Sequence, residues 1–184
     1  MDEGSLLLSA MLGLAAKLGD RSRVTIPNLA SLMLLVEEAG VKILMTGDGH
    51  ARDILKGLEK SEKLDQQGKL HVNVLKVQHH GSENNIDADF CKRITADHYI
   101  FCGNGSRKNP DLTVVQLIID TRLADGKEGK FKLWFNSSVK MAGTEDNAAQ
   151  MHQLEDLVAQ AASHSHGRLA YRFLKQGSKL EIDI

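Results

Sequence analysis

The sequence has few of the features that mark specialised classes of protein. Two cysteines, Cys91 and Cys102, are too few for a disulfide framework, and the apolar run around Cys102 favours a buried free thiol. Two prolines and 4% aromatic residues indicate regular elements joined by glycine turns. A formal net charge of -1 gives no overall attraction to nucleic acid, so a nucleic-acid substrate would require a local basic patch.

Long hydrophobic runs are also lacking. The apolar stretch that starts at Leu6-Leu7-Leu8 is interrupted by Ser9, is too short to span a bilayer and follows no basic region. We therefore expect a cytoplasmic protein without membrane contact. The length of 184 residues and the 42% share of hydrophobic residues fit a single domain over residues 1–184.

Alternating strand and helix patterns predict α/β layers. Apolar runs at residues 31–37 and 41–46, joined by a turn, predict a hairpin of two well-buried strands. Further strands are predicted at residues 72–78, 98–102 and 130–136, and a final hairpin at residues 168–174 and 179–184 around Gly177. Helices are predicted at residues 4–18, 50–63, 87–95 and 144–162, with another that has Pro110 in its first turn and continues through residues 117–122.

Two polar motifs follow predicted strands. The first, Thr46-Gly47-Asp48, places a carboxylate at the end of a strand, although Gly-Asp is also an ordinary turn. The second, His79-His80-Gly81-Ser82, places imidazoles where a metal such as zinc could bind, or where histidines cap or pack. Adjacent side chains on a strand point to opposite faces, so we expect at most one of the two histidines to bind metal directly.

A third polar segment lies at residues 103–110, again between a predicted strand and a predicted helix. Backbone amides of this glycine-rich loop, with Arg107 and Lys108 beside them, could hold a phosphate group. A solvent-exposed basic loop with no ligand fits the same residues equally well. Both interpretations stay open at this point.

The order of these motifs, each between a strand and a helix, resembles the metallo-β-lactamase-fold hydrolases. The nearest branch is the C-terminal domain of competence proteins that internalise DNA, with its soluble relatives. The resemblance extends from about Pro27 to Arg122. It implies a layered αβ/βα fold of the α/β class, of which this chain would hold the C-terminal half, with the N-terminal metal-motif half absent.

The resemblance implies roles for individual residues. Asp48 matches the metal-bridging aspartate of the family, and the pair His79-His80 matches its last histidine ligand. His80 is favoured because the family's ligand usually precedes a small residue directly, so Asp48 and His80 would carry catalysis. Asn28 falls where many members have a histidine ligand. The metal would be zinc or manganese, and the residues expected to contact substrate are Ser82, Asn104, Arg107 and Asn109.

The largest departure from the family is an absence. Its first metal motif, His-x-His-x-Asp-His, belongs upstream, yet no histidine precedes Asn28. His164 and His166 have His-x-His spacing, but they come too late in the chain and lack the following Asp-His. Two strong ligands are fewer than the three protein ligands of a typical catalytic zinc site, so we expect weak metal binding or none in this chain.

Two functional hypotheses follow. In the first, the protein is a metal-dependent hydrolase, phosphodiesterase-like or nuclease-like, acting on a phosphodiester or nucleic-acid substrate and impaired in this chain. In the second, it is a non-catalytic remnant that serves as a scaffold or protein-interaction module. In either case we expect a homodimer or the missing N-terminal half to cover the apolar sheet face.

Overall fold

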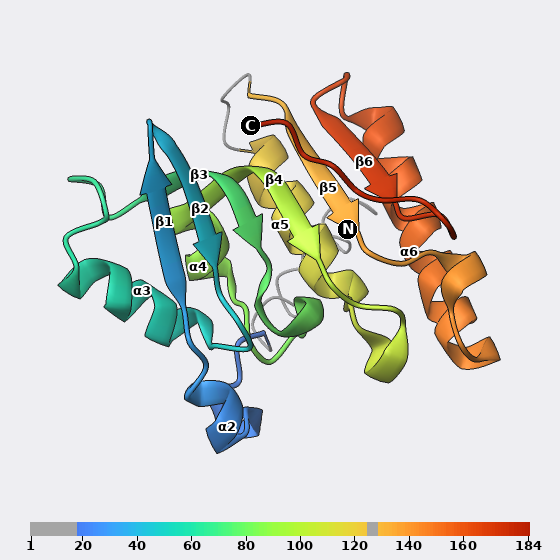
Figure 1. Ribbon diagram of the computed structural model, residues 1–184, viewed down its shortest axis with the longest axis horizontal. Helices are drawn as coiled ribbons and strands as arrows, with labels where there is room; N and C mark the ends of the chain where they lie inside the picture. The colour runs from blue at the N-terminus through green and yellow to red at the C-terminus, as the bar shows by residue number, and fades with distance from the viewer. Residues whose placement is uncertain (1–17, 125–128) are drawn as a thin grey trace, which may run out of the picture.

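The computed structural model of the protein describes residues 18–124 and 129–184, which form a six-stranded sheet in the order β1-β2-β3-β4-β5-β6 (Figure 1). The strands are β1 (Leu34–Glu38), β2 (Val41–Met45), β3 (Leu70–Lys76), β4 (Ile94–Phe101), β5 (Phe131–Phe135) and β6 (Leu169–Phe173). The helices are α2 (Ile26–Leu29), α3 (Ala51–Lys60), α4 (Ala88–Arg93), α5 (Leu112–Ala124) and α6 (Glu145–His164). No helix in these two ranges is long and apolar enough to cross a membrane.

The connections of the sheet place the longer helices on one face. β1 and β2 pair antiparallel through a tight turn at Ala39 and Gly40, both of which have positive φ. Every later neighbour pair is parallel. Each new parallel strand is added on the same side, and right-handed crossovers then bring every connecting helix to the same face. Accordingly, α3, α4, α5 and α6 lie behind the sheet in Figure 1.

The core lies between the sheet and this helix layer. The strands contribute fully buried residues such as Leu44, Leu75 and Leu133, which pack with helix residues in a single cluster. Phe135 stacks between two other rings, with centroids 5.0 Å from that of Phe101 and 4.3 Å from that of Phe173.

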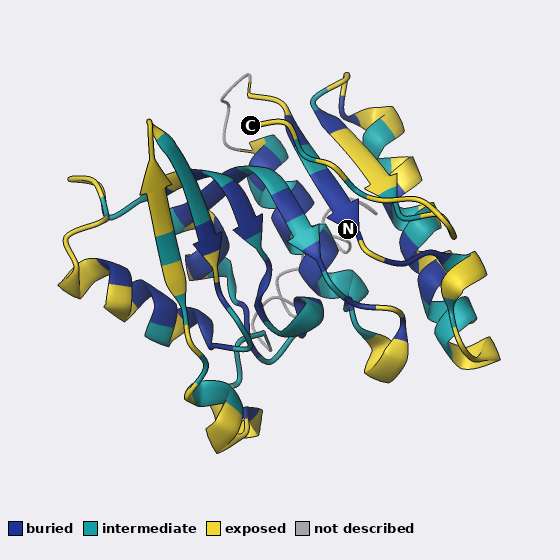
Figure 2. Ribbon diagram, in the orientation of Figure 1, coloured by how far each residue is buried: buried dark blue, intermediate teal, exposed yellow. Residues whose placement is uncertain are grey.

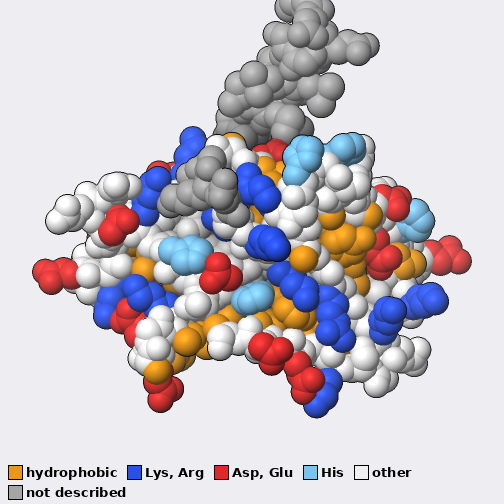
Figure 3. Space-filling model, turned by 90° about the horizontal axis from the view of Figure 1, so that it is seen from above, with side chains coloured by type: hydrophobic (Ala, Val, Ile, Leu, Met, Phe, Trp, Pro, Cys, Tyr) orange, Lys and Arg blue, Asp and Glu red, His pale blue; other side chains and the backbone are white. Residues whose placement is uncertain are grey.

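No described helix covers the opposite face of the sheet, which we call the open face. The strand register places a mixed row of side chains on it: Met45, Lys76, Ile100, Trp134 and Arg172. The Trp134 indole donates to Nδ1 of His98 at 3.0 Å, and the Lys132 ammonium lies 3.9 Å from the Trp134 ring centroid. Seen from above, along the direction of the strands, hydrophobic side chains also lie beside Lys and Arg at this end of the molecule (Figure 3).

The predicted α/β class and the hairpin of the first two strands are confirmed. The prediction that both strands are well buried is wrong, because β1 leaves Leu34 48% and Val36 47% exposed and β2 buries only Leu44. β1 is an edge strand, and its Leu34 and Val36 side chains lie on the open face. Figure 2 shows that exposure concentrates on β1 and β6, the two edges of the sheet.

Three other predictions about elements differ from the structure. Residues 179–184 form no strand, so the final hairpin is wrong, although Gly177 does lie in a turn. Pro110 precedes α5 rather than lying in its first turn. β4 begins at Ile94, inside the predicted helix at residues 87–95. The predicted helix at residues 4–18 lies, apart from its last residue, outside the described residues.

Candidate functional site

The candidate site lies at the carboxyl ends of β2, β3 and β4. Because these strands are parallel, the loops that follow them meet at one edge of the sheet, at the bottom of Figure 1. The loops contain Asp48, the histidine pair and the segment at residues 103–109, and α2 brings Asn28 to the same edge. The three motifs found in the sequence therefore belong to one end of the fold.

The histidine pair lies on a strained turn rather than on a strand. β3 ends at Lys76, and the following 3-10 turn, η2 (Gln78–Gly81), contains His79 with φ 41° and His80 with φ 60°. Left-handed non-glycine residues cost of order 1–3 kcal/mol each and persist only where their surroundings hold them. The backbone N–H of His79 donates to the Gly47 carbonyl at 3.1 Å, which ties this turn to the Asp48 loop.

This turn changes the expected orientation of the two imidazoles. On a strand, adjacent side chains would point to opposite faces, but here the ring centroids of His79 and His80 are 5.7 Å apart. Gly81 continues the left-handed path with φ 84°, and a Cβ atom there would lie 3.0 Å from Cδ1 of Phe101. The sequence His-His-Gly thus holds two imidazoles side by side next to a tightly packed glycine.

The hydrogen bonds of His79 fix its tautomer. Both Nδ2 bonds of Asn85 go to backbone carbonyls, to that of Asp48 at 2.9 Å and to that of Gly49 at 3.2 Å. Its Oδ1 therefore accepts from Nδ1 of His79, at 2.8 Å. In the neutral ring the lone pair is then on Nε2, which lies 3.4 Å from Nδ2 of Asn28. Histidines that bind metals are commonly oriented by such a bond on the other ring nitrogen.

His80 is oriented in a similar way. Its Nδ1 donates to the Cys102 carbonyl at 2.6 Å, which leaves Nε2 of the neutral ring as an acceptor. Both histidines line a cavity of about 440 Å³. The other lining residues are Cys102, Gly103, Asn104, Ser106, Arg107, Asn109 and Asn136. Since no carboxylate lines this cavity and Arg107 does, it is suited to an anionic group.

Asp48 is anchored beside the histidine turn, but it does not line the cavity. Its backbone N–H donates to Oγ of Ser31 at 3.1 Å, and its carboxylate lies 3.9 Å from the Lys76 ammonium. Lys76 in turn donates to the Gly47 carbonyl at 2.9 Å. Asp48 is therefore connected to His79 through Asn85 and the Gly47 backbone.

Of the residues expected to contact substrate, Asn104, Arg107 and Asn109 line the cavity and Ser82 does not. Ser82 is 6% exposed, and its hydroxyl accepts from the backbone N–H of Asn84 at 3.4 Å, so its role is in the turn. Asn85 was missed by the sequence reasoning. An asparagine in a polar turn gives no signal of its own, and its bonds to two distant segments become visible only in three dimensions.

Two groups near the site have shifted pKa values. Burial raises the pKa of the Cys102 thiol, which favours its neutral form. Burial also raises the pKa of Asp111 to about 6, although its carboxylate accepts from the backbone N–H of Glu83 at 2.8 Å. The sequence favoured a buried free thiol at Cys102; the structure has this thiol free but only partly buried.

Within residues 18–124 and 129–184, no group of three or more His, Cys, Asp and Glu side chains is arranged to hold a metal ion. Asp48, His79 and the Asn28 amide carry nitrogen and oxygen donors that zinc or manganese accepts, so they fit part of a coordination shell. Comparison of the chain with protein-family models, with curated proteins and with solved structures found no match. The geometry of the site is thus the basis for assigning a function.

Proposed function

We propose that this chain forms one side of the active site of a metal-dependent phosphodiester hydrolase with a metallo-β-lactamase-like layered fold. The observation that carries the proposal is the bond from Nδ1 of His79 to Asn85, which turns Nε2 toward Asn28. Asn85 also binds the Asp48 backbone, so one buried amide positions both candidate metal-binding segments. A histidine that only packed or capped would not need this shared support.

The contacts favour different roles for the two histidines. His79, linked through Asn85 to the Asp48 loop, would bind the metal together with Asp48, with Asn28 as a neighbouring donor. A bound zinc or manganese ion would lower the pKa of a water molecule and supply the attacking hydroxide. His80 would face the substrate, where Arg107 would neutralise a phosphate oxygen. Asn104 and Asn109 would position the same group by hydrogen bonds.

The remaining metal ligands would come from outside the described residues. The open face supports a second layer there, because Leu34, Val36 and Met45 are 48%, 47% and 42% exposed. Apolar surface of this kind usually marks a contact with another chain or segment. A second copy of the chain, or a separate half of the layered fold, would cover the open face. It would then bring the remaining metal ligands close to the strand ends.

A second candidate function is a non-catalytic scaffold or interaction module. The open face favours it, as does the small number of ligands among the described residues. In the hydrolase the histidine turn would bind metal, whereas in a scaffold it would only stabilise the fold. In a scaffold, substitutions at His79 would change stability and leave every metal-dependent property unaffected.

Calorimetric titration of the full chain with Zn²⁺ and with Mn²⁺ tests the hydrolase proposal. We expect weak binding that His79→Ala and Asp48→Asn each reduce by about 10- to 100-fold, whereas the exposed His152→Ala control has no effect. The rate of metal-dependent hydrolysis of bis(4-nitrophenyl) phosphate should also fall in His79→Ala and Asp48→Asn and stay unchanged in His152→Ala. Equal metal affinity in all four proteins would overturn the assignment of the ligands.

A further inference from the structure

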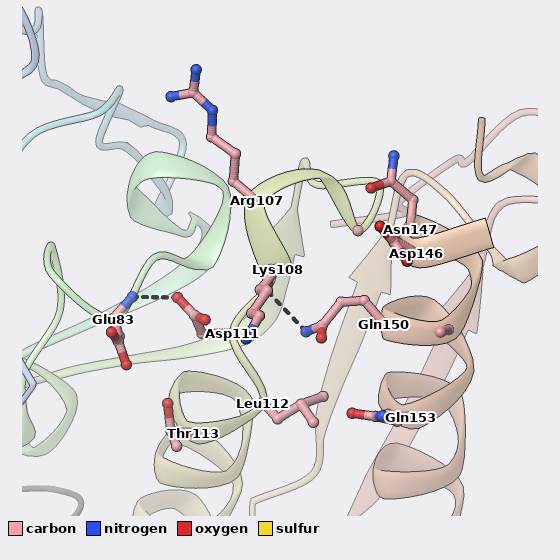
Figure 4. Close-up of a pocket in the computed structure, with 12 residues that line it drawn as sticks. Glu83, Arg107, Lys108, Asp111, Leu112, Thr113, Asp146, Asn147, Gln150 and Gln153 are labelled. Atoms are coloured by element: carbon pink, nitrogen blue, oxygen red, sulfur yellow. Dashed lines mark hydrogen bonds between the residues drawn. The ribbon is translucent and has the colours of Figure 1, made fainter. Parts of the chain in front are cut away.

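A groove runs between α5 and α6 on the outer side of the helix layer. Two cavities, of about 660 Å³ and about 740 Å³, share Leu112 and Gln153 among their lining residues, so they are consecutive sections of one groove. Figure 4 shows the first section, where Leu112 of α5 and Gln153 of α6 lie on opposite sides. The open face and the groove therefore lie on opposite sides of the sheet.

The floor of the second section is apolar. It contains partly buried side chains that pack against the core, among them Leu112, Leu123, Leu157 and Ala161. α5 thus presents leucine toward the groove as well as Val114 and Ile118 toward the sheet. A helix in an outer layer normally presents polar residues outward, so the apolar outer side of α5 is typical of a surface that another element covers.

Carboxylates line both sections of the groove and outnumber its basic residues. They are Glu83, Asp111, Asp120, Asp146 and Asp156, against Arg107, Lys108 and His164. Arg107 also points away from the groove, so it neutralises little of this charge (Figure 4). The groove therefore combines an apolar floor with an acidic border.

Two of these carboxylates are partly desolvated and form no ion pair within the described residues, although the Lys108 charge lies near enough to Asp111 to favour its ionised form. Asp120 accepts from Nε2 of Gln116 at 2.7 Å and makes no ion pair within the described part of the chain, and burial raises its pKa. Asp111 likewise has a raised pKa and no ion pair among those residues. Desolvated carboxylates of this kind are stabilised when a ligand brings positive charge to them.

We propose that the α5–α6 groove binds a cationic amphipathic helix of a partner protein. Leucine-like side chains at helical spacing would fill the floor, and Lys or Arg side chains would face Asp111, Asp120 and Asp156. Asp111 and Asp120 are separated by nine positions, about 13 Å along a helix, so cations on one face of the partner, about two to three turns apart, would come within side-chain reach of both. The inference is independent of the proposed hydrolase activity, because it uses none of the residues assigned to the metal.

Fluorescence anisotropy with the full chain tests the proposal. The probe is a labelled peptide of Leu, Ala and Lys, about 18 residues long, with leucines at helical spacing and lysines on both flanks. A scrambled peptide of the same composition, and one with Glu in place of Lys, are the controls. We expect the ordered cationic peptide to bind at least about tenfold more tightly than either control.

Two matched pairs of variants locate the binding surface. Ala161→Arg places a bulky cation in the groove, whereas Ala159→Arg places it on the exposed side of α6. Asp120→Asn removes a groove charge, whereas Asp183→Asn removes an exposed one near the C-terminus. Ala161→Arg and Asp120→Asn should each weaken peptide binding several-fold or more. The matched controls Ala159→Arg and Asp183→Asn should not. Equal binding of the scrambled peptide, equal effects within a pair, or loss of binding on Val36→Lys at the open face would each overturn the proposal.

Discussion

The same six strands form both faces of the sheet, but the side chains on the two faces differ in burial and in charge. On the helix face, rows of apolar side chains such as Leu44, Leu75 and Leu133 are 2% exposed or less. On the open face, the adjacent row mixes Met45 and Ile100 with Lys76 and Arg172. The covered face thus carries an apolar row, whereas the open face mixes apolar with charged side chains and leaves Met45 42% exposed, although Trp134 on the same face is only 4% exposed.

The largest expected difference between the faces is in stability. Phe135→Ala, on the helix face, should cost about 3–5 kcal/mol of unfolding free energy because it removes a fully buried ring from a stack of three. Met45→Ala, on the open face, should cost less than about 1 kcal/mol because Met45 is 42% exposed. Urea denaturation measures both. Equal losses would mean that the open face is as well packed as the helix face.

The second prediction concerns association through the open face. If another copy of the chain covers this face, Val36→Lys should weaken self-association at least about tenfold, because a charge would be buried in the contact. Gln66→Lys in the exposed loop before β3 adds the same charge elsewhere and should have no effect. Sedimentation velocity over a wide concentration range is the measurement. A wild-type chain that stays monomeric throughout would exclude the homodimer.

The third prediction uses Asp111, beside the helix layer. Its pKa is raised to about 6 from an ordinary 3.8, so the native state holds this proton more tightly than the unfolded chain does. The ionised carboxylate therefore destabilises the fold above pH 6, and this cost disappears as the pH falls from 6 to below 3.8. Asp111→Asn should raise stability at pH 7.5, by no more than about 1 kcal/mol after solvent screening, and have less effect at pH 4. Thermal unfolding at both pH values would contradict this if the gain were larger in acid.

The smallest effect is expected at an ion pair between neighbouring strands. Nε2 of His71 on β3 lies 3.2 Å from the Asp97 carboxylate on β4, and their side chains are 53% and 42% exposed. Exposed pairs contribute little, so Asp97→Asn should change the unfolding free energy by less than about 0.5 kcal/mol. Urea denaturation at pH 6 checks this. A loss above about 1 kcal/mol would indicate that something shields this pair from solvent.

Much of the helix face could be predicted from the sequence, because its elements depend on local patterns. Apolar runs located the strands, and helical spacing located α3 and α6. The exposure of β1 could not be predicted, since the same apolar pattern fits a buried strand and a strand without a covering layer. The alternation of Leu180, Ile182 and Ile184 likewise suggests a strand, yet pairing requires a partner that residues 179–184 do not meet.

The sequence predicted where the candidate site lies but not the contacts that its residues make. The motifs at Asp48 and at His79-His80 fell at the correct strand ends, because parallel strands deliver their following loops to one edge. Their contacts could not be foreseen, because the left-handed turn at His79 and the link through Asn85 depend on segments distant in the chain. The sequence favoured His80 as the metal ligand, whereas these contacts favour His79, which is the histidine that the titrations described above test.

The strand order has a consequence for how the protein is made. Every strand pairs with the strand that precedes it in the chain, so no pairing needs a segment that the ribosome has yet to synthesise. Each βα unit can add to the growing edge of the sheet as it emerges, from β2 toward β6, and the loops to be closed stay short for a parallel sheet. Nascent chains halted after β4 should therefore already protect the β2–β4 backbone from hydrogen exchange.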